Sequence, residues 1–144
     1  MSDAYDDQNI FAKILRDEIP SHTVYEDEFT RVIMDVMPTC EGHALVLPKA
    51  PVRNILDATP TEFSAVAEVT RLTAKAAMIA FTSDGVTIQQ NSESAGGQMV
   101  FHLHVHVMPR KNGVALLPPA SEMAPTERLE RDAEKYRAAF AKLV

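Results

Sequence analysis

Three histidines at alternate positions are the residues in this sequence best suited to chemistry. His102, His104 and His106 account for three of the five histidines of the chain. Successive side chains of a β-strand point to opposite faces. A strand over residues 100–108 therefore places the three imidazoles on one face, and it places an apolar, core-facing set on the other: Phe101, Leu103, Val105 and Val107. Imidazoles in register repel one another once charged, so the pattern favours a functional site over an exposed strand face.

Two kinds of chemistry use such a cluster. One is binding of a metal such as zinc, for which histidine is a common ligand. Three ligands in a row on a flat strand need help from another element, and His43 or His22 is available for that. The other is nucleophilic catalysis, because a neutral imidazole nitrogen attacks phosphorus well and leaves well. Neighbouring imidazoles can orient it, hold the phosphate and protonate the leaving group. Mutual repulsion keeps part of the cluster neutral near pH 7.

The loop before the cluster supports phosphate chemistry. Residues 94–98 are Ser-Ala-Gly-Gly-Gln. Paired glycines allow backbone N–H groups to approach an anion closely, and Gln98 can add a neutral donor. Glycines also form plain turns, so the loop indicates phosphate binding only because it lies beside the histidines.

The elements that must position these residues follow from periodicity and turn residues. We expect a short helix or turn over 10–15 and strands over 23–26, 29–35, 43–47, 85–91 and 100–108. A long helix begins after Thr59, where Pro60 suits the first position and Glu62 completes a capping box. A second amphipathic helix spans about 125–143. This order predicts an α+β fold with an antiparallel sheet.

The bulk composition limits the partners. The 144 residues suit a single domain, 1–144. The net charge of -6 argues against a protein that coats nucleic acid or an anionic membrane. The acidic start lacks the features of a secretory signal, and no apolar run could cross a bilayer. We therefore expect a cytoplasmic protein that binds neither nucleic acid nor membrane. The single cysteine, Cys40, is expected to be a partly buried filler.

At this point the sequence resembles the histidine triad (HIT) family. His102–Met108 is similar to its signature, and the segments that resemble the rest of the family in order and spacing are Ile10–Ile14, Glu18–Pro20, Tyr25–Asp27, Met34–Val36 and Gly42–Lys49. Val100–Phe101 and Pro109–Arg110 look like the bacterial branch that ends in a helix. The resemblance covers nearly the whole chain. It implies a HIT-like fold, with about five antiparallel strands, one long helix packed on them and a C-terminal helix, and it implies a homodimer.

The resemblance also implies roles for the histidines. His104 matches the nucleophile that forms a covalent nucleotidyl intermediate. His106 matches the residue on the phosphate and leaving-group side, and His102 matches the member that helps to orient His104. His43 matches an extra histidine beside the site.

A nucleotide pocket is implied in the same way. The apolar slot for the base matches Ile10, Phe11, Ile14 and Ile19, which sequence alone would assign to ordinary core. Asp35 matches the carboxylate that accepts hydrogen bonds from ribose hydroxyls. Asn91 matches a nucleotide contact, and Gln98 with the Gly97 backbone matches the phosphate-contacting loop. The resemblance as a whole implies a purine nucleotide as the substrate.

Two departures from the family pattern bear on the chemistry. Some members hold a structural zinc, but the accessory ligand positions here are Asn9, Ala12 and Pro51. We therefore predict no metal. Met99 stands where branches with strong phosphoramidase activity often carry a hydroxyl residue, which can bond the phosphate or the leaving group.

These observations predict a hydrolase or nucleotidyl transferase that cleaves purine nucleoside phosphoramidates or related phosphoesters without a cofactor. Two alternatives stay open. The substrate could be a dinucleoside polyphosphate, since the residues that select the leaving group are not identifiable. The chain could also be a nucleotide-binding module with vestigial catalysis, for which Met99 leaves room.

Overall fold

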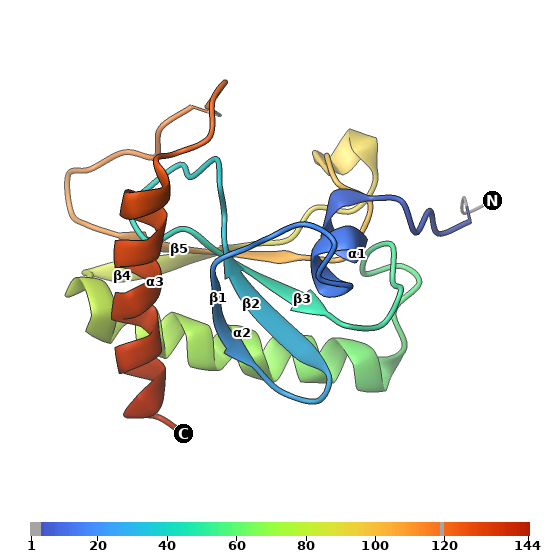
Figure 1. The fold of residues 1–144 in the computed structure, drawn as a ribbon, viewed down its shortest axis with the longest axis horizontal. Helices are drawn as coiled ribbons and strands as arrows, with labels where there is room; N and C mark the ends of the chain where they lie inside the picture. Colours follow the sequence, from blue (N-terminus) through green and yellow to red (C-terminus); the bar gives the residue numbers. More distant parts are fainter. Residues whose placement is uncertain (1–3, 119) are drawn as a thin grey trace.

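The computed structural model describes residues 4–118 and 120–144. The elements in chain order are α1 (Ile10–Leu15), β1 (Thr23–Glu26), β2 (Thr30–Met34), β3 (Ala44–Pro48), α2 (Pro60–Phe81), β4 (Gly85–Gln89), the short 3-10 turn η1 (Ser94–Gly96), β5 (Val105–Arg110) and α3 (Thr126–Ala141). The predicted α+β class, the antiparallel sheet of five strands, the long helix and the C-terminal helix are all confirmed (Figure 1).

The five strands form one antiparallel sheet in the order β1-β2-β3-β5-β4. The central strand β3 pairs with β2 over its whole length and with β5 over three residues, Ala44–Val46. The predicted fifth strand began at residue 100, which is wrong: β5 begins at Val105. The chain just before it bonds elsewhere, since the Leu103 N–H donates to the Val52 carbonyl at 2.8 Å.

Helix α2 begins as the capping-box pattern predicts. The Thr59 hydroxyl accepts from the Glu62 N–H at 3.1 Å, and the Glu62 carboxylate accepts from the Thr59 N–H at 2.8 Å. Pro60 is the first helical residue. This reciprocal arrangement satisfies two N–H groups that the start of a helix leaves without an internal partner.

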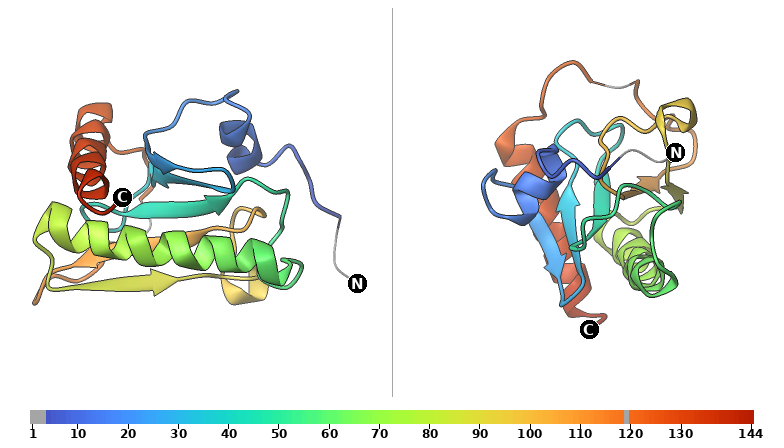
Figure 2. Two further views of the ribbon diagram at one scale, coloured as in Figure 1. Left: turned by 90° about the horizontal axis from the view of Figure 1, so that it is seen from below. Right: turned by 90° about the vertical axis from the view of Figure 1, so that its right-hand side faces the viewer.

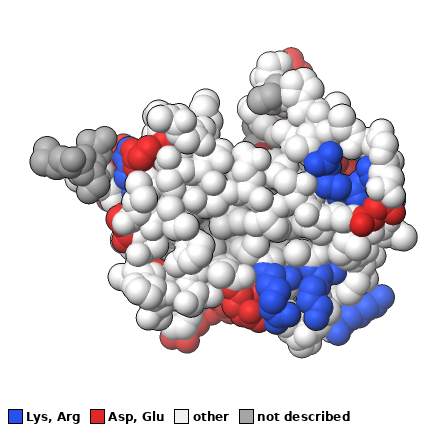
Figure 3. All heavy atoms as spheres, turned by 180° about the vertical axis from the view of Figure 1, so that it is seen from behind, with Lys and Arg blue, Asp and Glu red and all other residues white. Residues whose placement is uncertain are grey.

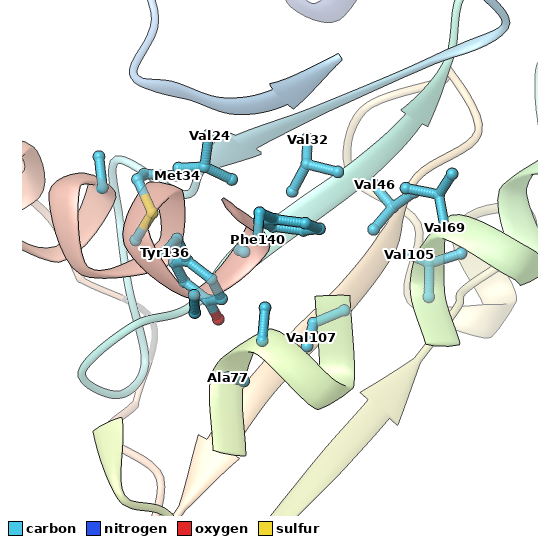
Figure 4. Close-up of a cluster of buried hydrophobic side chains, with 14 of the residues drawn as sticks. Val24, Val32, Met34, Val46, Val69, Ala77, Val105, Val107, Tyr136 and Phe140 are labelled. Carbon is cyan, nitrogen blue, oxygen red and sulfur yellow. The ribbon is translucent and has the colours of Figure 1, made fainter. Parts of the chain in front are cut away.

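The alternation of strand side chains divides the apolar residues between two faces. Helices α2 and α3 cover one face, where Val32, Val46 and Val107 join Val69 of α2 and Phe140 of α3 in the main core (Figure 4). The short helix α1 lies against the other face (Figure 2), where its Phe11 and Ile14 pack on a smaller set, Ile33, Leu45 and Leu47. A residue on β5 that points away from the main core therefore points toward the side of α1.

Helix α3 holds the turn that precedes β3. The Tyr136 hydroxyl donates to the Gly42 carbonyl at 2.5 Å, and the Asp132 carboxylate accepts from the Gly42 N–H at 3.2 Å. His22 also contacts this helix, because its Nδ1 donates to the Glu130 carboxylate at 2.7 Å. The helix thus fixes the backbone directly before His43.

The surface carries mixed charge. On the face opposite that of Figure 1, basic side chains form small groups with acidic ones beside them, and most of the face is uncharged (Figure 3). Within the described ranges, no helix is both long and apolar enough to cross a membrane. Burial raises the pKa of the half-buried Cys40 thiol to about 11, which leaves it protonated and unreactive near neutral pH, as expected for a filler.

Candidate active site

The three predicted histidines lie together, although only one of them is on a strand. His106 lies on β5, whereas His102 and His104 belong to the extended segment before it. The alternation still holds, because Leu103, Val105 and Val107 are buried in the main core. Phe101, which we expected to face that core, is only half-buried, and it packs beneath the Arg53 guanidinium at 4.2 Å instead.

His104 lies at the centre of the group. Its ring centroid is 5.1 Å from that of His106 and 4.8 Å from that of Phe11, with both pairs edge to face. The ring Nδ1 lies 2.7 Å from the backbone carbonyl of His102. A carbonyl can only accept, so Nδ1 carries the proton and Nε2 of the neutral ring carries a lone pair. The fold thereby presents Nε2 of His104 as a nucleophile.

The tautomers of the other three histidines are set in the same way. His102 Nε2 donates to the Pro48 carbonyl at 2.9 Å, which leaves its Nδ1 as an acceptor. His43 Nδ1 accepts from the backbone N–H of Thr39 at 3.1 Å, so the His43 proton is on Nε2. That Nε2–H donates to His106 Nδ1 at 2.9 Å. The proton of a neutral His106 is therefore on Nε2.

Burial keeps all four imidazoles neutral. Desolvation lowers the pKa of His102, His104 and His106 to about 4 each, and it also lowers the pKa of His43. The neighbouring imidazoles act in the same direction, since a charge on His106 disfavours a charge on His104. Neutral rings with defined tautomers are the form that nucleophilic attack requires.

Asp35 lies beside this group, at the end of β2. One carboxylate oxygen accepts from the Met37 N–H at 2.8 Å, and the other is 3.5 Å from His43 Nε2. Its side chain is partly exposed and retains acceptor capacity.

Asp35, His43 and His106 also offer one ligand atom each within 4.8 Å of one another, a spacing compatible with a metal ion. The hydrogen bonds argue against that use. A metal on His43 Nε2 would move the proton to Nδ1, where it would face the Thr39 N–H, and two donors would oppose each other. His22, the other candidate ligand, bonds Glu130 on α3 and is outside this group. That the site needs no metal stays a prediction.

The four residues expected to form the base slot do not share one environment. Phe11 and Ile14 are buried on the α1 face of the sheet, and Phe11 reaches His104. Ile19 is half-buried beside them. Ile10 is 44% exposed. The site edge of α1 is therefore apolar, with Phe11 as the residue in direct contact with the nucleophile.

The loop before the triad differs from the expected anion cradle. The N–H groups of Gly96, Gly97 and Gln98 donate to carbonyls of Glu93 and Ser94 within the loop. The Gln98 side chain, 3% exposed, is fully occupied: its oxygen accepts from Glu93 N–H at 2.7 Å, and its nitrogen donates to the Arg53 and Val100 carbonyls. Asn91 donates to the Gly97 carbonyl at 3.2 Å. Gln98 and Asn91 thus shape the loop, and Met99 projects from it with 87% exposure.

Comparisons with known proteins identify the family of this chain. A family model described as the HIT domain matches residues 16–113. This chain belongs to the HIT domain family.

Individual HIT relatives cover most of the chain. A Hit-like protein involved in cell-cycle regulation from Bartonella henselae is 47% identical to this chain and superimposes on it with a TM-score of 0.91. The match covers 95% of this chain and 99% of that protein. The purine nucleoside phosphoramidase of Escherichia coli K12 is 31% identical over 103 residues, which are 71% of this chain and 87% of that enzyme. The adenylylsulfatase HINT3 of Arabidopsis thaliana is 31% identical over 126 residues, which are 88% of this chain but 64% of the relative.

Sequence reasoning missed several residues outside the family motifs that hold the loop before the triad and His102 by hydrogen bonds. Arg53 donates twice to the Glu93 carboxylate, at 2.8 and 2.9 Å, and Asn54 donates to both Glu93 and Gln98. These bonds lower the pKa of Glu93 to about 2. Tyr5 bonds His102 from the other side. Arg, Asn, Glu and Tyr residues in polar segments give no signal of such contacts, because the partners lie 39 to 97 positions away.

Proposed function

We propose that this chain is a nucleotide hydrolase or nucleotidyl transferase in which His104 attacks the α-phosphorus of a purine nucleoside phosphoramidate or a related phosphoester. One observation carries the proposal. The His104 Nδ1–H is held by a backbone carbonyl at 2.7 Å, and burial holds the pKa of the ring at about 4. The Nε2 lone pair is therefore available at neutral pH, without a general base to remove a proton.

The reaction divides into two displacements. In the first, His104 Nε2 forms a bond to phosphorus while the bond from phosphorus to the leaving nitrogen or oxygen breaks. The charge that develops on the phosphorylated ring is stabilised by the Nδ1–H bond to the His102 carbonyl. In the second, water attacks phosphorus and gives up a proton to solvent, the bond to Nε2 breaks, and a nucleoside monophosphate is released with the neutral ring restored.

His106 is suited to contact the phosphate or the leaving group. Its Nδ1 accepts from His43 Nε2–H, so its own Nε2–H is the donor toward the site. A second proton on His106 would have to enter at Nδ1, where it would oppose the His43 N–H. His106 therefore stays neutral and donates a hydrogen bond, and the leaving group takes its proton from solvent.

The remaining contacts that we propose for the nucleotide lie at Asp35, along α1 and at the loop before the triad. The Asp35 carboxylate already accepts from the Met37 N–H, and its remaining lone pairs accept hydrogen bonds from the ribose hydroxyls. The base lies along the apolar edge of α1 beside Phe11 and Ile10. Gly97 and Gln98 support the loop that borders the phosphate, and Met99 lies at its open side.

A homodimer is part of the proposal. Strand β4 is an edge of the sheet, and its Ile88 is exposed, as are Met78 and Ile79 near the end of α2. An open edge strand beside exposed apolar side chains suits pairing with a second copy. Sedimentation equilibrium should give twice the 15.9 kDa of the chain. A single species at the monomer mass would contradict this part.

The function is tested by rapid mixing with adenosine 5′-phosphoramidate followed by intact-mass analysis. The wild type should show a transient adenylyl adduct and then release AMP. His104→Ala should bind the nucleotide, which calorimetry can measure, and form no adduct. His22→Ala is the matched control, because His22 lies on the α3 side and should leave the adduct unchanged.

The alternatives are separated by the same experiment. No adduct and no AMP from a wild type that binds nucleotide would overturn the phosphoramidase assignment. A dinucleoside polyphosphate is then the next substrate to offer. If the wild type and His104→Ala bind both substrates equally and convert neither, the chain is a binding module and the catalytic proposal fails.

A further inference from the structure

Tyr5 lies outside the triad motif but contacts one of its members. It comes from the segment before α1, and its hydroxyl is 2.5 Å from His102 Nδ1, 97 positions along the chain. The direction of this bond is determined, because His102 Nε2 donates to the Pro48 carbonyl and Nδ1 carries the lone pair. The Tyr5 O–H therefore donates. The two rings also meet edge to face at 5.7 Å.

Asn9 holds the Tyr5 oxygen from behind. Its Nδ2 donates to the Tyr5 oxygen at 3.0 Å and to the Asp6 carbonyl at 2.8 Å. Its side-chain oxygen accepts from the Ala12 N–H at 2.9 Å, which makes Asn9 the N-cap of α1. One side chain thus fixes both the start of α1, which carries Phe11 against His104, and the hydroxyl that reaches His102.

We propose that Tyr5 is a positioning residue for the His104 nucleophile, an inference that rests on the proposed function. Tyr5 acts through His102, whose ring it holds by a hydrogen bond and whose backbone carbonyl accepts the His104 Nδ1–H. The hydrogen bonds run in one direction, from Asn9 to Tyr5 to His102, and His102 in turn donates to Pro48. The segment before α1 is therefore part of the active site.

The same bond acts together with burial, which is the main reason that His102 is neutral. Protonation of His102 would occur at Nδ1, the atom that accepts the Tyr5 proton, so the bond disfavours the imidazolium. Among the charged groups near this ring, Asp57 favours the imidazolium and a charged His104 disfavours it. Loss of the Tyr5 hydroxyl should let water reach Nδ1 and raise the pKa of His102 from about 4. A purely structural role for Tyr5 predicts no such shift.

Tyr5→Phe is the first test, because phenylalanine keeps the ring contact and removes only the hydroxyl. The matched control is Tyr25→Phe, which removes the hydroxyl by which Tyr25 of β1 bonds Asp27. In Tyr5→Phe, kcat for adenosine 5′-phosphoramidate should fall about threefold to tenfold, the range that corresponds to one neutral hydrogen bond. KM should change less than twofold. Titration of ¹⁵N-labelled histidine in the nucleotide-free protein should show His102 protonating at higher pH. Tyr25→Phe should change none of these.

Asn9→Asp is the second test. Aspartate preserves the N-cap acceptor of α1, but it replaces the donor to Tyr5 by a carboxylate that can accept the Tyr5 proton. Asn9→Asp should therefore reproduce the Tyr5→Phe defect, and the double variant should be no worse than either single one. If Asn9→Asp acted only by loosening α1, its loss of kcat would instead add to that of Tyr5→Phe in the double variant.

The outcomes separate this inference from the proposed function. Unchanged His102 signals or an unchanged kcat in Tyr5→Phe would overturn the inference even in an active enzyme. A wild type that turns over no nucleotide overturns the proposed function, and with it the role of Tyr5 toward the nucleophile. In that case a shifted His102 titration would show only that Tyr5 holds the ring.

Discussion

Substitution of Gly42 by alanine should be among the most damaging small changes in this protein. Gly42 has a φ of +79°, and alanine in this left-handed region costs roughly 1–2 kcal/mol. An added Cβ would also lie 2.5 Å from Phe81 Cε2 and 2.7 Å from its Cζ. Forcing a methyl group into a packed core typically costs about 1–3 kcal/mol. The two effects together predict a loss of roughly 2–5 kcal/mol in the free energy of unfolding.

Phe81 cannot easily move aside. Its ring packs edge to face on Tyr136 at 5.1 Å, and the Tyr136 hydroxyl donates to the Gly42 carbonyl itself. A shift of Phe81 would therefore disturb the bond that holds the turn. His43 follows directly in the chain, so we expect the surviving folded fraction of Gly42→Ala to lose turnover as well.

Urea denaturation followed by circular dichroism measures the effect, with two other glycines as controls. Gly113 has nearly the same φ, +78°, but nothing within 4 Å of an added Cβ. Gly113→Ala should therefore show only the conformational cost of roughly 1–2 kcal/mol. Gly85 also has open space around it, and its backbone is that of a strand, so Gly85→Ala should lie within about 0.5 kcal/mol of the wild type. Equal losses in Gly42→Ala and Gly113→Ala would refute the steric argument.

Two further predictions concern the site. The folded pKa of His102, His104 and His106 is about 4, below the usual value of 6.5. The unfolded chain thus binds more protons between these values, and these groups should lower stability as pH falls from about 6.5 to about 4 but not above pH 7. A thermal midpoint that stays constant over that window would contradict the burial of the cluster. Met99→Ser, at a position 87% exposed, should leave stability within about 0.5 kcal/mol and raise phosphoramidate kcat about threefold to tenfold through a new hydrogen bond. An unchanged kcat in stopped-flow turnover would show that the hydroxyl does not reach the phosphate or leaving group.

Local signals predicted what depends on neighbours in the chain. The capping box at Thr59 and Glu62 uses residues three positions apart, so the start of α2 could be placed to the residue. The apolar alternation at Leu103, Val105 and Val107 placed these side chains correctly on the core face. Both patterns depend on residues that are a few positions apart in the chain.

Contacts between distant segments account for the errors. Strand β5 begins only at Val105 because the Leu103 N–H bonds the Val52 carbonyl, in the loop after Pro48, and not a group of β3. Gln98 was expected to face a phosphate, and it is occupied instead by Arg53, Asn54 and Glu93. A buried amide must satisfy its donors and its acceptor, but the sequence does not say which distant groups will do so.

The chemical state of the histidines follows from backbone contacts rather than from the side chains of the motif. The tautomer of His104 depends on the His102 carbonyl, that of His102 on the Pro48 carbonyl, and that of His43 on the Thr39 N–H. Every residue offers a carbonyl, and every residue but proline an N–H, so substitutions at these neighbours leave the partners in place as long as the backbone keeps its course. The triad motif and His43 supply four imidazoles, and the path of the chain through Thr39, Pro48 and His102 decides which nitrogen of each carries a lone pair. This explains why the spacing of the histidines could predict a nucleophile, whereas its reactive atom became apparent only from the fold.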